Sequence, residues 1–100
     1  FFFGVAGDLL DTLRRVGQRP RVIILRMRLV PLLDASGVRA VGEFIRQAGV
    51  GGTRIILSGV QAQPAEMLRR AHLGGDSSKV LYASDYAAAL VLARDVLSAE

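Results

Sequence analysis

The residues Asp34-Ala35-Ser36-Gly37 are the ones whose types and order could support chemistry. The Asp34 carboxylate can accept hydrogen bonds from the unpartnered amides of Ser36 and Gly37 at the start of a helix. Ser36 would then lie in the first turn, where a phosphate added to its hydroxyl would meet free amides and the positive end of the helix dipole, although Asp34 would repel it. The same spacing also fits an ordinary capped helix start without any chemistry.

The segment before this loop is a predicted strand. Residues 22–25 are apolar at successive positions, which is typical of a strand that helices cover on both faces, and we expect it to be the central strand. Beyond it the side chains should alternate, with Met27 and Leu29 on the buried side and Arg26, Arg28 and Val30 on the other. Pro31 cannot donate to a ladder, so the strand should end before it.

An amphipathic helix follows the loop. Its apolar positions recur three or four residues apart and are Val38, Val41, Ile45 and Ala48. The charged residues between them, Arg39, Glu43 and Arg46, should face water, and we take them as a candidate partner surface. Arg28 and Arg39 are weaker candidates for holding a phosphate or nucleotide beside Ser36.

Strands and helices alternate along the rest of the chain. The further predicted elements are a helix at 4–18, a glycine turn at 49–52, a strand at 53–58, a helix with Gln63 as N-cap, a strand at 79–82, and a helix at 85–98 with Ser84 as N-cap and Tyr86, Leu90, Ala93 and Leu97 on its buried stripe. This order predicts one α/β domain over residues 1–100, with a small, mostly parallel sheet and about four helices.

Three cations, Arg69, Arg70 and His72, lie near the end of the third predicted helix. They could bind an anion, but cations at a helix C-terminus also interact favourably with the helix dipole without any ligand. Both interpretations stay open at the level of sequence.

Composition argues against several classes of function. The chain has no cysteine and one histidine, so it offers neither a thiol nucleophile nor a recognisable metal-binding set. Its carboxylates are scattered, and no basic strand carries interleaved aromatics for single-stranded nucleic acid. We therefore predict no enzyme activity, no cofactor beyond a weak possibility of a nucleotide, and no nucleic-acid partner. The net charge of +4 favours anionic neighbours such as lipid headgroups.

The loop and its surroundings resemble the STAS domain, which is named for sulfate transporters and anti-sigma-factor antagonists. The signature of that domain is an Asp, a small residue, Ser or Thr, and Gly before an apolar helix, as in Asp34-Ala35-Ser36-Gly37-Val38. Phrases similar to those of the C-terminal STAS domains of SulP-type anion transporters occur in order at residues 2–3, 19–27, 30–37, 52–60 and 67–71. The resemblance therefore extends over most of the chain.

This resemblance implies a sheet with most helices on one face and a regulatory, non-catalytic role. The domain would lie at the cytoplasmic face of the inner (plasma) membrane, as part of a transporter for sulfate, bicarbonate or a similar anion. Its expected partners are the transmembrane domain of the same polypeptide, a regulatory protein and an anionic lipid surface. The alternative is a free-standing anti-sigma-factor antagonist, which the resemblance implies would be switched by phosphorylation of Ser36 within a loop that includes Asp34, Ala35 and Gly37.

The start of the chain also suggests a parent protein. Three phenylalanines open it without an initiator methionine, and they look like the tail of a strand that begins upstream. We expect a fragment of a larger membrane transporter. If its first strand is shortened, an exposed sheet edge could pair with a second copy, so homo-oligomerisation is possible.

Overall fold

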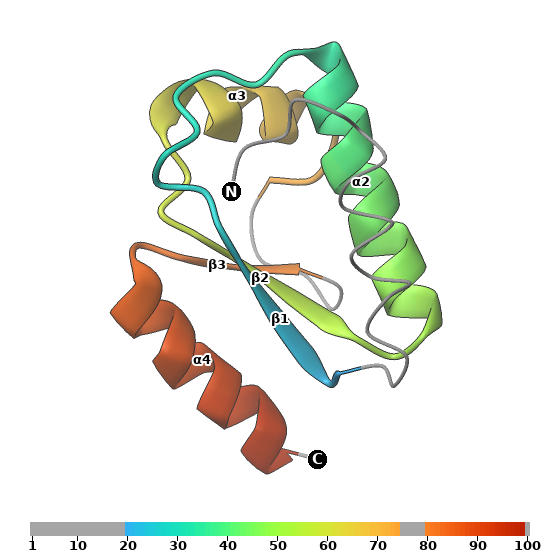
Figure 1. Cartoon of the computed structure of the whole chain (residues 1–100), viewed down its shortest axis with the longest axis vertical. Helices are drawn as coiled ribbons and strands as arrows, with labels where there is room; N and C mark the ends of the chain where they lie inside the picture. The colour runs from blue at the N-terminus through green and yellow to red at the C-terminus, as the bar shows by residue number, and fades with distance from the viewer. Residues whose placement is uncertain (1–19, 75–79, 100) are drawn as a thin grey trace.

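The computed structural model describes residues 20–74 and 80–99, which form an α/β unit (Figure 1). Its elements in chain order are β1 (Val22–Arg26), α2 (Ala35–Val50), β2 (Arg54–Ser58), α3 (Ala62–Arg70), β3 (Val80–Ala83) and α4 (Tyr86–Ala99). The described part thus has three helices where about four were predicted for the whole chain. The helix predicted at residues 4–18 lies outside the described residues.

The three described strands form one parallel sheet in the order β1-β2-β3. Ile24 of β1 is opposite Ile56 of β2, which in turn is opposite Leu81 of β3. The predicted parallel pairing is confirmed, but the prediction that β1 is the central strand is wrong for the described sheet. The middle position belongs to β2, whose last four residues are all buried because it has a strand on each side and a helix over each face.

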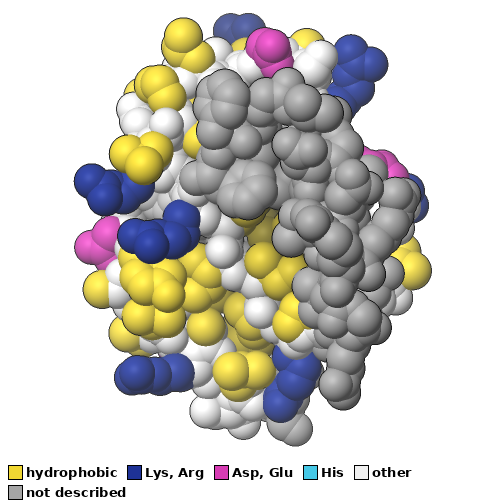
Figure 2. Space-filling view, viewed as in Figure 1, with side chains coloured by type: hydrophobic (Ala, Val, Ile, Leu, Met, Phe, Trp, Pro, Cys, Tyr) yellow, Lys and Arg dark blue, Asp and Glu magenta, His cyan; other side chains and the backbone are white. Residues whose placement is uncertain are grey.

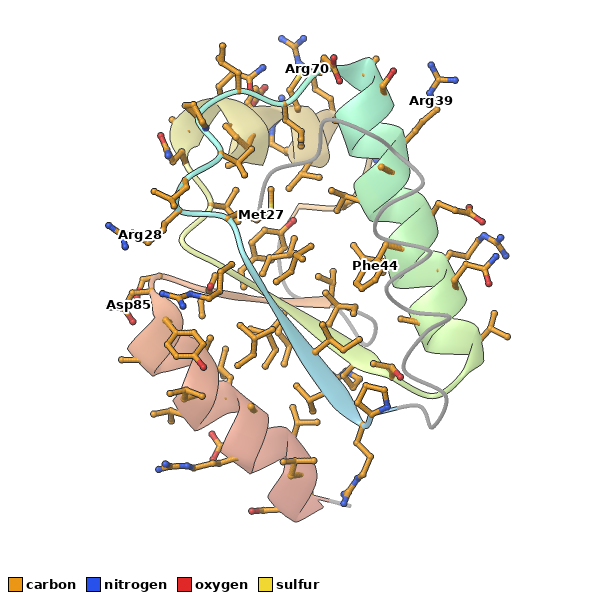
Figure 3. All side chains as sticks on the ribbon, in the orientation of Figure 1. Met27, Arg28, Arg39, Phe44, Arg70 and Asp85 are labelled. Atoms are coloured by element: carbon orange, nitrogen blue, oxygen red, sulfur yellow. The ribbon has the colours of Figure 1, made fainter. Side chains whose placement is uncertain are left out.

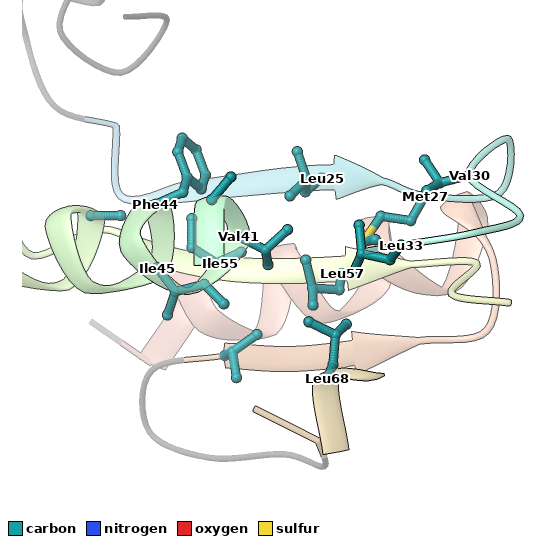
Figure 4. Packing of buried hydrophobic residues seen from close by; sticks show 13 residues of the cluster. Leu25, Met27, Val30, Leu33, Val41, Phe44, Ile45, Ile55, Leu57 and Leu68 are labelled. Carbon is teal, nitrogen blue, oxygen red and sulfur yellow. The ribbon is translucent and has the colours of Figure 1, made fainter. Parts of the chain in front are cut away.

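The larger part of the core lies between the sheet and helices α2 and α3 (Figure 4). On α2, Phe44 and Ile45 are buried together with the predicted Val41 and Ala48. They pack with side chains from alternate positions of the strands and from α3, which are Leu25, Ile55, Leu57, Leu68 and Val80. Apolar positions three or four residues apart on α2 and two apart on the strands thus meet on one face of the sheet.

Helix α4 covers the other face of the sheet and contacts all three strands (Figure 1). Its buried residue is Ala89, whereas Tyr86, Leu90 and Leu97 of the predicted buried stripe are exposed. That prediction was wrong because α4 is apolar around most of its circumference, so periodicity did not single out the face that meets the sheet. Figure 2 shows apolar side chains gathered over α4 with arginine or lysine side chains around them.

The alternation predicted beyond β1 is also wrong. Leu29 is 72% exposed and Val30 only 4%, the reverse of the expectation. The cause is a turn at residues 28–29, closed by a hydrogen bond of 3.0 Å from the Val30 amide to the Met27 carbonyl oxygen. A turn interrupts the two-residue period of a strand, so Val30 returns to the core beside Met27.

Two of the predicted helix caps are also displaced. Helix α3 begins at Ala62 with Gln61 as its N-cap, which places Gln63 inside the helix and not at its cap. Helix α4 is capped by Asp85 and not by Ser84, since Asp85 Oδ1 accepts a hydrogen bond of 2.8 Å from the Ala88 amide. None of the described helices has the length and apolar composition needed to cross a lipid bilayer.

Candidate functional site

A loop at residues 27–34 connects β1 to the candidate switch residues at the start of α2. Met27, Val30 and Leu33 are buried and anchor it to the core, while Leu29 and Leu32 are exposed. This pattern of buried anchors with exposed residues between them keeps the loop close to the domain surface.

Gln63 of α3 fixes the end of this loop. Its Oε1 accepts a hydrogen bond of 2.7 Å from the Leu33 amide, and its Nε2 donates one of 3.1 Å to the Leu33 carbonyl oxygen. One side-chain amide thus satisfies both backbone groups of the residue before Asp34. Sequence reasoning missed this role because the two residues are thirty positions apart and no local pattern connects them.

The predicted N-cap of α2 is confirmed. Asp34 Oδ1 accepts a hydrogen bond of 2.8 Å from the Gly37 amide, and the Val38 amide donates to the Asp34 carbonyl oxygen at 2.9 Å. A side chain at Gly37 would be crowded, because a Cβ there would lie 2.7 Å from Leu33 Cδ1. The small residue therefore lets the first turn pack against the loop anchor.

Ser36 is exposed in that first turn, between the exposed Ala35 and the buried Gly37. A modifying enzyme could reach its hydroxyl. A phosphate there would lie near the positive end of the α2 dipole, but the Gly37 amide already binds Asp34, so the added anion would compete with the cap. Phosphorylation of Ser36 stays a prediction.

The predicted partner surface on α2 contains an ion pair. Arg46 and Glu43 are joined by a salt bridge, and Gln47 Nε2 also donates to Glu43 Oε1 at 3.2 Å. The hydrogen bond from Arg46 lowers the pKa of Glu43, with a smaller contribution from that of Gln47. Arg39 is exposed nearer the start of the helix. With Glu43 and Arg46 neutralising one another, this surface presents the charge of Arg39 to a partner.

The two residues proposed to hold a phosphate beside Ser36 are not brought together. Figure 3 shows Arg28 and Arg39 on opposite sides of the molecule, Arg28 beyond the end of β1 and Arg39 on the outer side of α2. The two arginines therefore do not share one phosphate site at Ser36, and a phosphate site formed by Ser36 with either Arg28 or Arg39 stays a prediction.

The cations at the end of α3 have a structural explanation. Arg69 binds Glu66 through two hydrogen bonds of 2.8 and 2.6 Å, and Arg70 Nε lies 3.4 Å from the same carboxylate. The Arg69 hydrogen bond is the main cause that lowers the pKa of Glu66 to about 2. His72 follows in a left-handed conformation with φ 62° and is exposed. Both arginines thus already have an anionic partner within their own helix.

Comparison with known proteins decides the family. A family model described as the STAS domain matches residues 1–84, a span that includes the whole loop, α2, β2, α3 and β3. The chain belongs to the STAS domain family. Among solved structures, this STAS domain is similar to one titled as a sulfate transporter family protein from Wolinella succinogenes. The two share 36% sequence identity at a TM-score of 0.80, and the match covers 98% of this chain and 80% of that chain. The search of curated proteins gave no match.

Membership of the family confirms the resemblance found in the sequence and leaves the role of individual residues open. STAS domains are generally non-catalytic. In the described residues of this STAS domain, no three His, Cys, Asp or Glu side chains gather as a metal site would require. Ser36 is exposed in the first turn of α2, which Asp34 caps, and its role as a switch stays a prediction.

Proposed function

We propose that this STAS domain is the regulatory cytoplasmic part of a SulP-like secondary anion transporter for sulfate, bicarbonate or a similar anion. It would act through contacts and not through catalysis. The observation that carries the proposal is the likeness to the sulfate transporter family protein, at 36% identity over 98% of this chain. The domain would lie at the cytoplasmic face of the plasma membrane, next to the transmembrane domain of the same polypeptide and to anionic lipid.

The contact surface in this proposal consists of residues 34–37, which form the N-cap and first turn of α2, and the outer side of that helix. The first turn is exposed at Ala35 and Ser36, and it is fixed by the Asp34 cap and by the hydrogen bonds between Gln63 and the preceding Leu33. A fixed and exposed segment loses little conformational freedom when a partner binds. Arg39 adds a positive charge next to it, which favours an acidic partner surface.

Cell fractionation of the native gene product with an antibody against this domain tests the proposal. We expect an integral membrane protein with an apparent mass several times that of the 10.7 kDa chain. A soluble product close to that mass would overturn the transporter assignment. In the intact protein, Arg39→Glu should lower the rate of anion uptake at unchanged membrane abundance, whereas the matched charge reversal Arg94→Glu on α4 should not.

The exposure of Ser36 favours a second candidate, a free-standing anti-sigma-factor antagonist. In that case an anti-sigma kinase would bind the loop and transfer a phosphoryl group to the Ser36 hydroxyl, and the added charge would break the complex. Incubation with the cognate kinase and ATP should then phosphorylate the wild-type chain and not Ser36→Ala. Absence of transfer to either chain would count against this candidate.

A further inference from the structure

A cavity of about 290 Å³ lies where the three parallel strands end. Its walls come from the end of each strand and the segment after it, and they comprise Arg26, Arg28, residues 58–61 and residues 84–86. Loops converge at the carboxyl ends of parallel strands, and crevices at this edge of α/β sheets are common ligand sites. The cavity is separate from the loop at residues 34–37, none of whose residues line it.

Two arginines, Arg26 and Arg28, belong to the lining of this cavity. Arg26 Cζ lies 4.2 Å from the centroid of the Tyr86 ring, a cation–π contact that orients the guanidinium group. Arg28 lies on the same side of the molecule as Asp85, near the start of α4 (Figure 3). Guanidinium groups present paired N–H donors whose spacing matches the oxygens of a phosphate. The positive charge of the cavity therefore has the chemistry of an oxyanion site.

Hydrogen bonds between the loops hold this lining in place. The Met27 amide donates to the Ser58 carbonyl oxygen at 2.8 Å, and the Gly59 amide donates to the Ala83 carbonyl oxygen at 3.0 Å. Gln61 Nε2 donates to the Arg28 carbonyl oxygen at 2.6 Å. Backbone positions tied in this way do not have to be ordered when a ligand binds, which reduces the entropic cost of binding.

Gly59 brings the loops after β1 and β2 into direct contact. Its φ is +67°, a conformation that favours glycine, and a Cβ there would lie 3.0 Å from Arg28 Cβ. The backbone that carries Arg28 thus packs closely on the loop that forms the floor of the cavity.

One carboxylate, Asp85, also lines the cavity. It accepts the Ala88 amide hydrogen bond as the N-cap of α4, so its position has a structural purpose. Against the two arginines, it lowers the formal charge of the lining from +2 to +1. An anion in the cavity would be attracted by Arg26 and Arg28 and repelled by Asp85.

We propose that this cavity binds a phosphate group, supplied either as inorganic phosphate or as the headgroup of an anionic phospholipid. The volume is just below the usual range for ligand pockets, so the cavity has room for a phosphate group. The proposal does not depend on whether the domain regulates a transporter, since it concerns only the described side chains at this edge of the sheet.

The first arm of the test is a titration of the isotope-labelled 100-residue chain with inorganic phosphate, followed by amide chemical shifts. We expect saturable shifts at Gly59, Ser84 and Tyr86. Arg26→Gln and Arg28→Gln should each weaken binding about tenfold, since each removes a charge-assisted hydrogen-bond donor. The matched variant Arg39→Gln removes the same charge from α2 and should change the affinity by less than about twofold.

The variant Asp85→Asn tests the proposal through an increase in phosphate affinity, which a loss of folding could not produce. Asparagine is also a good N-cap, so α4 should be retained while the repulsive charge is removed, and phosphate affinity should rise about threefold.

The second arm is co-sedimentation with phosphatidylglycerol-containing vesicles, with pure phosphatidylcholine vesicles as the control. One informative result is that the variants change vesicle binding in the order expected for phosphate, while free phosphate itself gives no saturable shifts. That result would support the proposal and identify the lipid headgroup as the source of the phosphate group.

Two results would overturn the proposal. One is the absence of both saturable phosphate shifts and binding to anionic vesicles in the folded wild-type chain. The other is an equal weakening by Arg39→Gln and Arg28→Gln, which would show that net charge and not this cavity attracts the anion.

Discussion

The two faces of the sheet differ in how the helices that cover them use their apolar residues. Helix α2 buries Val41, Phe44 and Ile45 against the strands, whereas α4 buries Ala89 and leaves Leu90, Val91 and Leu97 exposed. The small Ala89 allows α4 to approach the sheet, and Leu92 and Val96 are only half-buried. The comparison shows that apolar residues on α4 contribute less to the core than their number suggests. Substitution of the exposed ones should therefore cost little stability, and their side chains are accessible to a partner.

The sharpest test of this contrast compares Phe44→Ala on α2 with Leu90→Ala on α4. Phe44 is 2% exposed and Leu90 37%. The cavity left by Phe44→Ala should lower the free energy of unfolding by about 3–5 kcal/mol. Leu90→Ala should cost about 1 kcal/mol, because more than a third of Leu90 is already exposed to water and its removal leaves no closed cavity. Urea unfolding of both variants gives the two values, and equal losses would refute the distinction between the faces.

On the side of the sheet that α2 and α3 cover, Gln63 of α3 binds both backbone groups of Leu33, and removing its side chain tests how much this contact stabilises the domain. Gln63→Ala leaves the amide and the carbonyl of the buried Leu33 without their side-chain partner, so the free energy of unfolding should fall by about 1–2 kcal/mol. Gln47→Ala on the surface of α2 is the matched control and should lie within about 0.5 kcal/mol of wild type. A loss for Gln47→Ala as large as that for Gln63→Ala would contradict this stabilising role of Gln63.

The N-caps of α2 and α4 provide a finer comparison. Asp34 caps a helix packed on the main core through a partly buried hydrogen bond, while the Asp85 bond is exposed. Asp34→Ala should cost about 1 kcal/mol and Asp85→Ala about 0.5 kcal/mol. Thermal or urea unfolding measures both, and the Asn variants at each position should restore most of the loss. A larger loss at Asp85 would reverse the ranking of the two faces.

The smallest expected effect concerns the ion pairs on the outer side of α3. Because Arg69 lowers the pKa of Glu66 from 4.5 to about 2, the stabilisation is present above pH 4.5 and is lost as the pH falls towards 2. Glu66→Gln should therefore flatten the dependence of unfolding free energy on pH in that range. The pair is exposed, so high salt should reduce the effect. An unchanged slope in Glu66→Gln would show that the pair contributes nothing to folding.

Features set by neighbouring residues were predictable from the sequence. The Asp34 cap and the buried Val41 and Ile45 depend on residues within one or two turns. The predicted glycine turn at 49–52 was correct only for Gly51 and Gly52, because α2 continues through Gly49 and Val50. The strands were found because β1 and β2 are rich in β-branched residues. The family resemblance likewise depended on local phrases in a fixed order.

Features set by distant residues were not predictable in this way. Gln63 looked like an N-cap, but its contact with Leu33 is made across thirty positions. Leu29 and Val30 exchanged sides because of a turn that the alternation could not show, and the cavity between Arg28 and Asp85 depends on three loops meeting. The candidate switch at Ser36 was located from the sequence, whereas the cavity required coordinates.

The parallel order β1-β2-β3 also determines when each part of the domain can form during synthesis. Each strand is added at the same edge of the sheet, next to the strand before it, once the helix that connects the two has been synthesised. The unit of β1, α2 and β2 can therefore assemble before β3 exists. Ile56 of β2 is buried but lies outside the α2-side cluster, and among the described helices the one over its face of the sheet is α4. In a nascent chain paused before Tyr86 the described residues would leave this apolar face exposed, so synthesis of α4 should lower the tendency of the chain to aggregate.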